Sequence, residues 1–285
     1  MTVFERTDDL RAILTEKKKR GASIGFVPTM GALHEGHLRL IDRCVKENDI
    51  CVSSIFINPL QFNNPEDFRL YPTTFEQDAS LLEARGCHLL FHPSVQEMYP
   101  EAVNETYDFG GLTQVMEGLY RPGHFNGVAV IVRRLFDITE PKRAYFGEKD
   151  YQQLLVVKEL ARRHCPKVEI VACPTVREAD GLAMSSRNLR LNQEQRTSSP
   201  LIYKTLKWAS ENPEHLSAEQ LRQSCISKIN QDPWLKTEYF EFSDACNLTP
   251  VESWKITQEV VACTAVFAGQ VRLIDNIRFF PTFAE

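Results

Sequence analysis

The sequence lacks the features that mark membrane-spanning, secreted and nucleic-acid-binding proteins. Its 285 residues contain no apolar run near the ~20 residues that a membrane-spanning helix needs. The first ten residues, MTVFERTDDL, lack the apolar core of a signal peptide. Asp and Glu (38) outnumber Lys and Arg (33), so the net charge of −5 leaves no excess cation to neutralise the phosphates of a nucleic acid. We therefore expect no membrane and no nucleic-acid partner.

The eight cysteines also lack the spacing of a metal or redox motif. No C-x-x-C pair occurs, and most cysteines lie in apolar stretches. Reduced, buried thiols are typical of the cytoplasm, where cellular reductants keep thiols from pairing. We therefore expect a soluble cytoplasmic protein.

Apolar runs alternate with helical patterns through the first two thirds of the chain. The runs that predict strands are 22–27, 50–57, 88–92, 143–146 and 168–173. Such alternation predicts an α/β fold with a doubly wound, mostly parallel sheet.

The pattern changes after about residue 175. Helical stretches near 193–209 and 217–230 are followed by three strand candidates, 238–243, 260–267 and 271–277. The short connection Ala268–Gln270 predicts that the last two strands form an antiparallel hairpin. We therefore expect a first domain over 1–175 and a smaller C-terminal α+β domain over 176–285.

The segment 28–37, Pro-Thr-Met-Gly-Ala-Leu-His-Glu-Gly-His, joins the first strand of this sheet to a helical pattern. A strand, a glycine-bearing loop and a helix start present backbone N–H groups and a positive dipole end to phosphate. It is not a Walker A loop, because His37 and Leu38 occupy the places of Lys and Ser/Thr. His34 and His37 have three interpretations: a metal pair, a helix cap or phosphate contacts. The preceding strand, the glycines and the helix start favour phosphate.

Two more polar loops follow strand candidates directly, Asn58–Gln61 and Gly147–Asp150. Ligands of doubly wound sheets bind beyond the carboxyl ends of the strands, so we expect all three loops to converge on one crevice. Lys149 can supply a point positive charge to phosphate, and Asp150 can either cap the next helix or bind a ligand. Gln153, one turn into that helix, offers a neutral amide to a hydroxyl-bearing substrate.

Three further groups give weaker signals. The Ser185-Ser186-Arg187 run ends a polar segment that either forms a solvated loop or folds over the crevice and adds donors to a polyphosphate. Arg121-Pro-Gly-His124 is a turn that carries a cation and an imidazole. Asp78, on a predicted helix, is either an exposed helix residue or a magnesium ligand.

Taken together, five motifs carry a family resemblance: PTMGALHEGHL, SIFINPLQF, RPGHFNGV, FGEKDYQQL and VREADGLAMSSRN. In this order, between residues 22 and 190, the chain resembles the pantothenate synthetase (pantoate–β-alanine ligase) family. That family belongs to the HxGH nucleotidyltransferase superfamily, which is related in fold to class I aminoacyl-tRNA synthetases. The resemblance implies a Rossmann-like N-terminal domain and a cytoplasmic homodimer. One position departs from the family pattern, because Thr73 stands where many members have Arg.

The resemblance also implies a two-step reaction that depends on ATP and Mg²⁺. The carboxylate of (R)-pantoate would attack the α-phosphorus of ATP to give pantoyl adenylate and pyrophosphate. The amine of β-alanine would then attack the acyl group to give pantothenate and AMP. The partners of the protein would thus be the small molecules pantoate, β-alanine and ATP.

The same resemblance assigns the site residues. His37 takes the position that the family assigns to a proton donor, and His34, Lys149 and Arg187 join it as catalytic residues. Gln61 and Gln153 match pantoate-binding glutamines, with Asn58, Arg121 and His124 as further substrate candidates, and Asp78 matches a residue linked to the metal. The ATP-binding positions are Met30, Gly31, Ala32, Leu33, His34, Glu35, Gly36, His37, Gly147, Glu148, Lys149, Asp150, Val176, Met184, Ser185, Ser186 and Arg187.

Two other interpretations stay open from the sequence. A related HxGH nucleotidyltransferase would transfer AMP or CMP to a phosphate, and its turnover would not depend on an amine. A catalytically silent nucleotide-binding regulator would keep the pocket and bind ATP without releasing pyrophosphate in the presence of pantoate.

Overall fold

A computed structural model describes residues 1–213, 216–254 and 259–281 of the chain. Within it the chain divides into two compact units, the first formed by Met1–Thr113, Glu117–Glu148 and Gln153–Pro174 and the second by Gln114–Met116, Lys149–Gln152 and Thr175–Glu285. Among the described helices, none combines the length and the apolarity needed to cross a bilayer.

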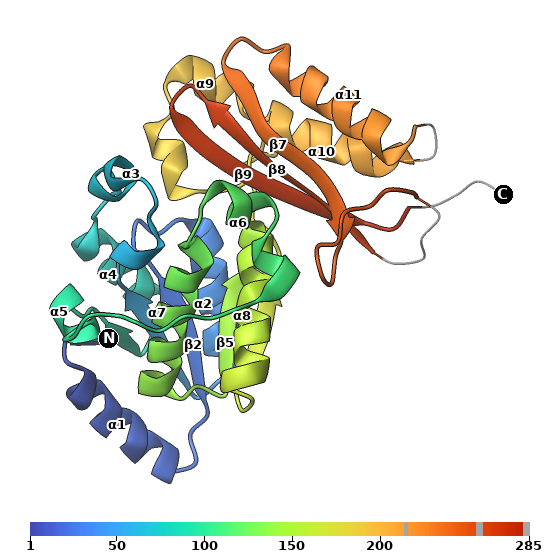
Figure 1. The fold of residues 1–285 in the computed structure, drawn as a ribbon. Helices are drawn as coiled ribbons and strands as arrows, with labels where there is room; N and C mark the ends of the chain where they lie inside the picture. Colours follow the sequence, from blue (N-terminus) through green and yellow to red (C-terminus); the bar gives the residue numbers. More distant parts are fainter. Residues whose placement is uncertain (214–215, 255–258, 282–285) are drawn as a thin grey trace. The chain divides into compact units, whose positions relative to one another are not determined.

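The first unit is built on a six-stranded parallel sheet with the order β1-β4-β3-β2-β5-β6 (Figure 1). The α/β prediction of a doubly wound parallel sheet is confirmed. Its elements, including those at the boundary with the second unit, are β1 (Thr2–Phe4), α1 (Thr7–Lys19), β2 (Ile24–Thr29), α2 (Glu35–Glu47), β3 (Ile50–Ile55), η1 (Pro59–Gln61), α3 (Pro65–Arg69), α4 (Phe75–Ala84), β4 (Leu89–Phe91), α5 (Val95–Met98), η2 (Gly110–Thr113), α6 (Met116–Tyr120), α7 (His124–Thr139), β5 (Arg143–Gly147), η3 (Glu148–Asp150), α8 (Tyr151–His164) and β6 (Glu169–Cys173).

Alternate residues of the central strands supply two separate cores, one on each face of this sheet. On β2, Ile24 and Phe26 pack with residues of α1, α7 and α8, whereas Val27 packs with residues of α2 and α4. A Cβ on Gly25 would lie 2.5 Å from Cys44 Sγ, so this glycine allows α2 to approach β2 closely. Because both faces are covered, the central strands are mostly apolar, as parallel strands usually are.

The second unit contains a three-stranded antiparallel sheet with the order β7-β8-β9 (Figure 1). Helices α10 and α11 pack on one face of it through an apolar core. The predicted hairpin is confirmed, and Gly269 makes its turn with φ +60°. The elements are η4 (Ser186–Arg190), α9 (Gln193–Ser198), α10 (Leu201–Glu211), α11 (Ala218–Asn230), β7 (Leu235–Asp244), β8 (Val260–Ala268) and β9 (Val271–Phe279).

Two short segments of the second unit, 114–116 and 149–152, come from the sequence range 1–175. Hydrogen bonds within the unit account for this. Gln152 Nε2 donates to Val115 O at 2.9 Å, and Tyr151 OH donates to Ala245 O at 2.7 Å. The turn after β5 therefore passes from one unit to the other.

Candidate active site

The order of the strands marks where a ligand should bind in the first unit. From β2 the chain proceeds through β3 to β4 on one side, whereas β5 and β6 lie on the other side of β2. The switch point of the sheet therefore lies between β2 and β5, and ligands of such sheets bind beyond the carboxyl ends of the strands at this point. The loop after β2 begins at Met30, and the turn after β5 begins at Glu148.

The loop after β2 is held by a buried carboxylate, which the sequence did not predict. Asp78 of α4 is 1% exposed, and its two oxygens accept hydrogen bonds from Ala32 N–H and Leu33 N–H, each at 2.8 Å. Gly31 N–H instead donates to Thr29 Oγ1 at 3.3 Å, and both Gly31 (φ +83°) and Ala32 (φ +49°) are left-handed. These three amides therefore have protein acceptors in this structure, and the expectation that the loop contacts phosphate stays a prediction.

The two histidines of the segment cap α2 reciprocally. His34 is the N-cap residue, and its Nδ1 accepts from Gly36 N–H at 3.1 Å, while His37 Nδ1 accepts from His34 N–H at 3.4 Å. Their ring centroids lie 4.1 Å apart. A neutral imidazole whose Nδ1 accepts carries its hydrogen on Nε2. Each ring can therefore cap the helix and still donate from Nε2, at the positive end of the α2 dipole.

Gln61 lies beside the same loop, at the end of η1. Its Nε2 donates to Met30 Sδ at 3.0 Å, and its Oε1 accepts from Asn58 Nδ2 at 3.1 Å. Asn58 is 1% exposed, and its Oδ1 accepts from Tyr99 OH at 2.7 Å. Burial raises the pKa of Tyr99, so this phenol stays protonated and donates. These contacts give Asn58 a positioning role for Gln61, and a direct substrate contact for Asn58 stays a prediction.

The turn Arg121–His124 supports Gln61 from the other side. The backbone carbonyl of Gln61 accepts from Arg121 Nη2 at 3.2 Å and lies 2.8 Å from His124 Nδ1. Gly127 of α7 touches η1 so closely that an added Cβ would lie 2.5 Å from the carbonyl carbon of Leu60. In this geometry Arg121 and His124 contact the backbone of Gln61.

The turn after β5 carries Lys149, whose side chain is 18% exposed and whose Nζ lies 3.9 Å from Asp150 Oδ2. The carbonyl of Lys149 accepts from Asn276 Nδ2 of β9 at 2.8 Å, within the second unit. Gln153 is half-buried in the first turn of α8.

Residues 176–184 form a tight hairpin in the second unit. Met184 N–H donates to Val176 O at 3.0 Å, and Glu178 N–H donates to Leu182 O at 2.8 Å. The hairpin is bound to β9, because Arg177 donates to the two oxygens of Asp275 at 2.6 and 3.0 Å. It leads directly into Ser185–Arg187, where Ser185 Oγ accepts from Arg187 N–H at 3.3 Å. This segment is therefore a hydrogen-bonded hairpin followed by a turn.

Asp275 and Asn276 are residues that the sequence analysis missed. Asp275 is 5% exposed, and burial raises its pKa, while the hydrogen bonds and charge of Arg177 and the charge of Lys149 act in the opposite direction. The signal was present in the sequence, since an aspartate that alternates with Val271 and Leu273 lies on the buried face of the strand and requires a partner there.

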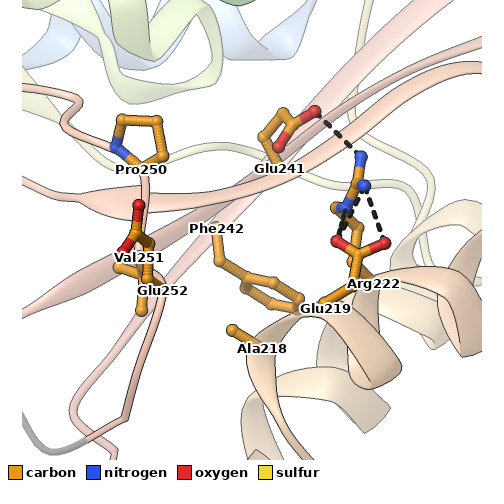
Figure 2. Close-up of a pocket in the computed structure, with 8 residues that line it drawn as sticks. All are labelled: Ala218, Glu219, Arg222, Glu241, Phe242, Pro250, Val251 and Glu252. Atoms are coloured by element: carbon orange, nitrogen blue, oxygen red, sulfur yellow. Dashed lines mark hydrogen bonds and ion pairs between the residues drawn. The ribbon is translucent and has the colours of Figure 1, made fainter.

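A separate cavity of about 360 Å³ lies in the second unit and is lined by none of the predicted site residues (Figure 2). Arg222 lies between two carboxylates there, 2.7 Å from Glu219 and 3.4 Å from Glu241. Burial raises the pKa of Glu241, and Ala218, Phe242, Pro250 and Val251 supply the apolar part of the lining. Three of the four charged groups of this cavity, Glu219, Arg222 and Glu241, are paired with each other.

In the described part of the chain, no three His, Cys, Asp or Glu side chains are grouped as metal ligands. Asp78 Oδ2 accepts from both Ala32 N–H and Thr74 Oγ1, whereas Oδ1 accepts from Leu33 N–H. The metal pair, one of the three interpretations of His34 and His37, thus has no third ligand of these types in this part of the chain. The assignment of Asp78 to the metal stays a prediction.

Comparison with known proteins identifies what this arrangement resembles. A family model described as pantoate-beta-alanine ligase matches residues 2–278. Pantothenate synthetase of Bacteroides fragilis is 48% identical over 282 residues, which cover 98% of this chain and 99% of that protein. A crystal structure of pantothenate synthetase from Thermus thermophilus is 42% identical with a TM-score of 0.91, covering 99% of this chain and all of that one. Pantoate-beta-alanine ligase from Francisella tularensis, complexed with beta-gamma ATP and beta-alanine, is 34% identical with a TM-score of 0.81 and 97% coverage of both chains.

Proposed function

The chain belongs to the pantoate–β-alanine ligase family, and from this premise we propose which of its residues carry each part of the reaction. As a member of this family the protein is an AMP-forming ligase that joins pantoate to β-alanine and makes pantothenate, with ATP as co-substrate. The observation that carries the residue assignment is the reciprocal histidine cap of α2, which lies at the switch point of the sheet.

The reaction begins with the activation of a carboxylate. A carboxylate is a poor acyl donor because its oxygen is a poor leaving group. In the proposed first step, a carboxylate oxygen of pantoate attacks the α-phosphorus of ATP, and pyrophosphate leaves with the bonding electrons. In the second step the β-alanine amine attacks the acyl carbon of pantoyl adenylate, loses a proton and expels AMP.

The protein's main task in the first step is electrostatic, since negative charge grows on the departing pyrophosphate. We assign to the phosphates the Nε2–H groups of His34 and His37, aided by the α2 dipole, with His37 as the proton donor. The ammonium of Lys149, the hydroxyls of Ser185 and Ser186 and the guanidinium of Arg187 are assigned to the same phosphates. The remaining proposed nucleotide contacts are Met30, Gly31, Ala32, Leu33, Glu35, Gly36, Gly147, Glu148, Asp150, Val176 and Met184.

Pantoate is assigned to the neutral amides of Gln61 and Gln153, with Gln61 also near β-alanine. The contact between Gln61 and Met30 supports this, because it brings the amide beside the loop that leads to His34. Asn58, Arg121 and His124 then act by holding Gln61.

The proposal includes magnesium, which neutralises phosphate charge when it is bound. Mg²⁺ in ATP sites usually binds phosphate oxygens, waters and only one or two carboxylates, so the absence of a three-residue cluster among the described residues does not conflict with it. Asp78 Oδ1 is the oxygen proposed to contribute. We also propose that the protein acts as a homodimer in the cytoplasm. Six of the eight cysteines are buried, which fits the expectation of buried thiols in a reducing compartment.

Isotope exchange between ATP and pyrophosphate, measured with pantoate and without β-alanine, isolates the adenylation step. His34→Ala and Lys149→Ala should each lower this exchange by about 10²–10³-fold, because each removes a donor to the growing charge. His88→Ala is the matched control, since His88 Nδ1 also accepts a backbone amide, from Cys51 at 3.0 Å, yet has no assigned role. Near wild-type exchange in either test variant would refute the phosphate assignment.

A further inference from the structure

Two consecutive residues of β9, Asp275 and Asn276, bind the two segments of the second unit that carry its proposed phosphate contacts. Successive side chains of a strand point to opposite faces of the sheet. One dipeptide can therefore hold a different segment on each side. The segments it holds are the 176–184 hairpin and the turn at Lys149.

On one side, Asp275 binds the hairpin through Arg177. The guanidinium makes a bidentate ion pair with the Asp275 carboxylate at 2.6 and 3.0 Å, and its carbon lies 3.6 Å from the centre of the Tyr203 ring. The same guanidinium donates to Asn276 O at 3.2 Å and to Gly181 O at 3.1 Å. Four hydrogen bonds from one rigid group fix the hairpin, and with it the start of Ser185–Arg187.

On the other side, Asn276 binds the turn after β5. Its Nδ2 donates to Lys149 O at 2.8 Å, and Asn276 is 7% exposed. This part-buried bond to the backbone of Lys149 holds the Cα from which the ammonium extends. The negative charge of Asp275 also acts on this lysine, since Lys149 lowers the pKa of that carboxyl.

We infer that Asp275 and Asn276 are positioning residues of the adenylation step, which hold Lys149 and the Ser185–Arg187 turn in one fixed arrangement. This inference rests on the proposed roles of Lys149 and Arg187. A displacement of about 1 Å far from the reacting atoms can cost about 10²-fold in rate. The loss of either clamp, Asn276 on Lys149 or Asp275 on Arg177, should therefore reduce adenylation, because it displaces groups assigned to the phosphates.

A double-mutant cycle tests the Asn276 clamp. Asn276→Ala should lower ATP–pyrophosphate exchange by about 10- to 100-fold at saturating ATP and pantoate. The double variant Asn276→Ala, Lys149→Ala should be no slower than Lys149→Ala alone, because Asn276 acts through Lys149. Asn230→Ala is the control, because it removes a side-chain hydrogen bond from Thr237 N–H in the same unit. Its effect on the exchange rate should be the same in the wild-type and in the Lys149→Ala background. If Asn276→Ala does not fold by circular dichroism, Asn276→Leu, which keeps a similar size, loses the donor and adds no charge, enters the cycle instead.

The Asp275 clamp needs a variant that leaves no unpaired buried charge. The combined change Arg177→Met, Asp275→Leu removes both charges and should fold. The ATP–pyrophosphate exchange rate of this combined variant should fall toward the rate of Arg187→Ala. Adding Arg187→Ala to the combined variant should lower the rate no further. Independent, multiplicative losses in folded variants of both cycles would overturn the inference while leaving the assigned roles of Lys149 and Arg187 intact. Normal exchange in Lys149→Ala and Arg187→Ala would instead refute those assigned roles.

Discussion

Gly127→Ala tests how Gln61 is placed, because the change adds one methyl group at the contact between α7 and η1. The new Cβ would lie 2.5 Å from Leu60 C and 2.8 Å from Gln61 N, and closer still to Leu60 O. Ordinary contacts begin at 3.4 Å, so either the helix or the loop must move by about 1 Å. All three atoms belong to the backbone, so no side-chain rotation can relieve the overlap.

Two effects of Gly127→Ala should follow. Overpacking of this kind lowers the free energy of unfolding by about 1–3 kcal/mol. A loss of 1 kcal/mol lowers the thermal unfolding midpoint of a 150–250-residue domain by about 2–4 °C. A shift of about 1 Å in Gln61 should also lower kcat/KM for pantoate by as much as about 10²-fold. The KM for ATP should change little, since the His34 and His37 cap does not depend on this contact.

Thermal melts and steady-state kinetics well below the midpoint separate these effects. Gly111→Ala is the control, because a Cβ there meets no atom within 4 Å and its φ is not left-handed. Pantoate kinetics equal to wild type in folded Gly127→Ala would show that this contact does not place Gln61 for catalysis.

Two further predictions concern Gln153 and Glu159. Gln153→Ala should raise the KM for pantoate in the exchange assay with little change for ATP, and an unchanged pantoate KM with a raised ATP KM would contradict its assigned role. Hydrogen bonds from Arg162 and Arg163 lower the pKa of Glu159 from 4.5 to about 2, so its contribution to stability is complete above pH 4.5 and is lost as pH falls toward 2. Glu159→Gln should therefore lower the free energy of unfolding at pH 6. The difference from wild type should shrink as the pH falls below 4.5, and a difference that does not change with pH would contradict the prediction.

The sequence predicted the strands of the central sheet well because they are buried on both faces. The runs 22–27, 50–57 and 143–146 became β2, β3 and β5 with ends shifted by a few residues. Strand β1 was missed, since its three residues are too few to show a period and two of them are exposed. The helical stretch near 193–209 is two helices, α9 and α10, which are separated at Ser199 and Pro200. Proline lacks the N–H that would continue the first of them.

The site was harder to predict because its polar contacts join distant parts of the chain. The sequence placed the loops after β2 and β3 at the same edge of the sheet, and Met30 and Gln61 of these loops are in contact. It did not reveal that Asp78 would accept from Leu33, 45 residues away, or that Asn276 would donate to Lys149, 127 residues away. Such bonds depend on how side chains meet after the sheet has formed, and no local pattern records them.

His34 and His37 combine a helix cap with a proposed phosphate contact, and this double role restricts how the loop could change into one that binds phosphate through a lysine. Each imidazole accepts a backbone N–H at Nδ1, and in this tautomer its Nε2 carries the hydrogen and is a donor. A lysine has three donors and no acceptor, so it would attract an anion yet leave the first turn of the helix without the acceptor it now has. A single change to lysine would therefore gain an anion contact and lose a helix cap, so a stable exchange of one kind of loop for the other requires a second substitution that restores an acceptor for the amide.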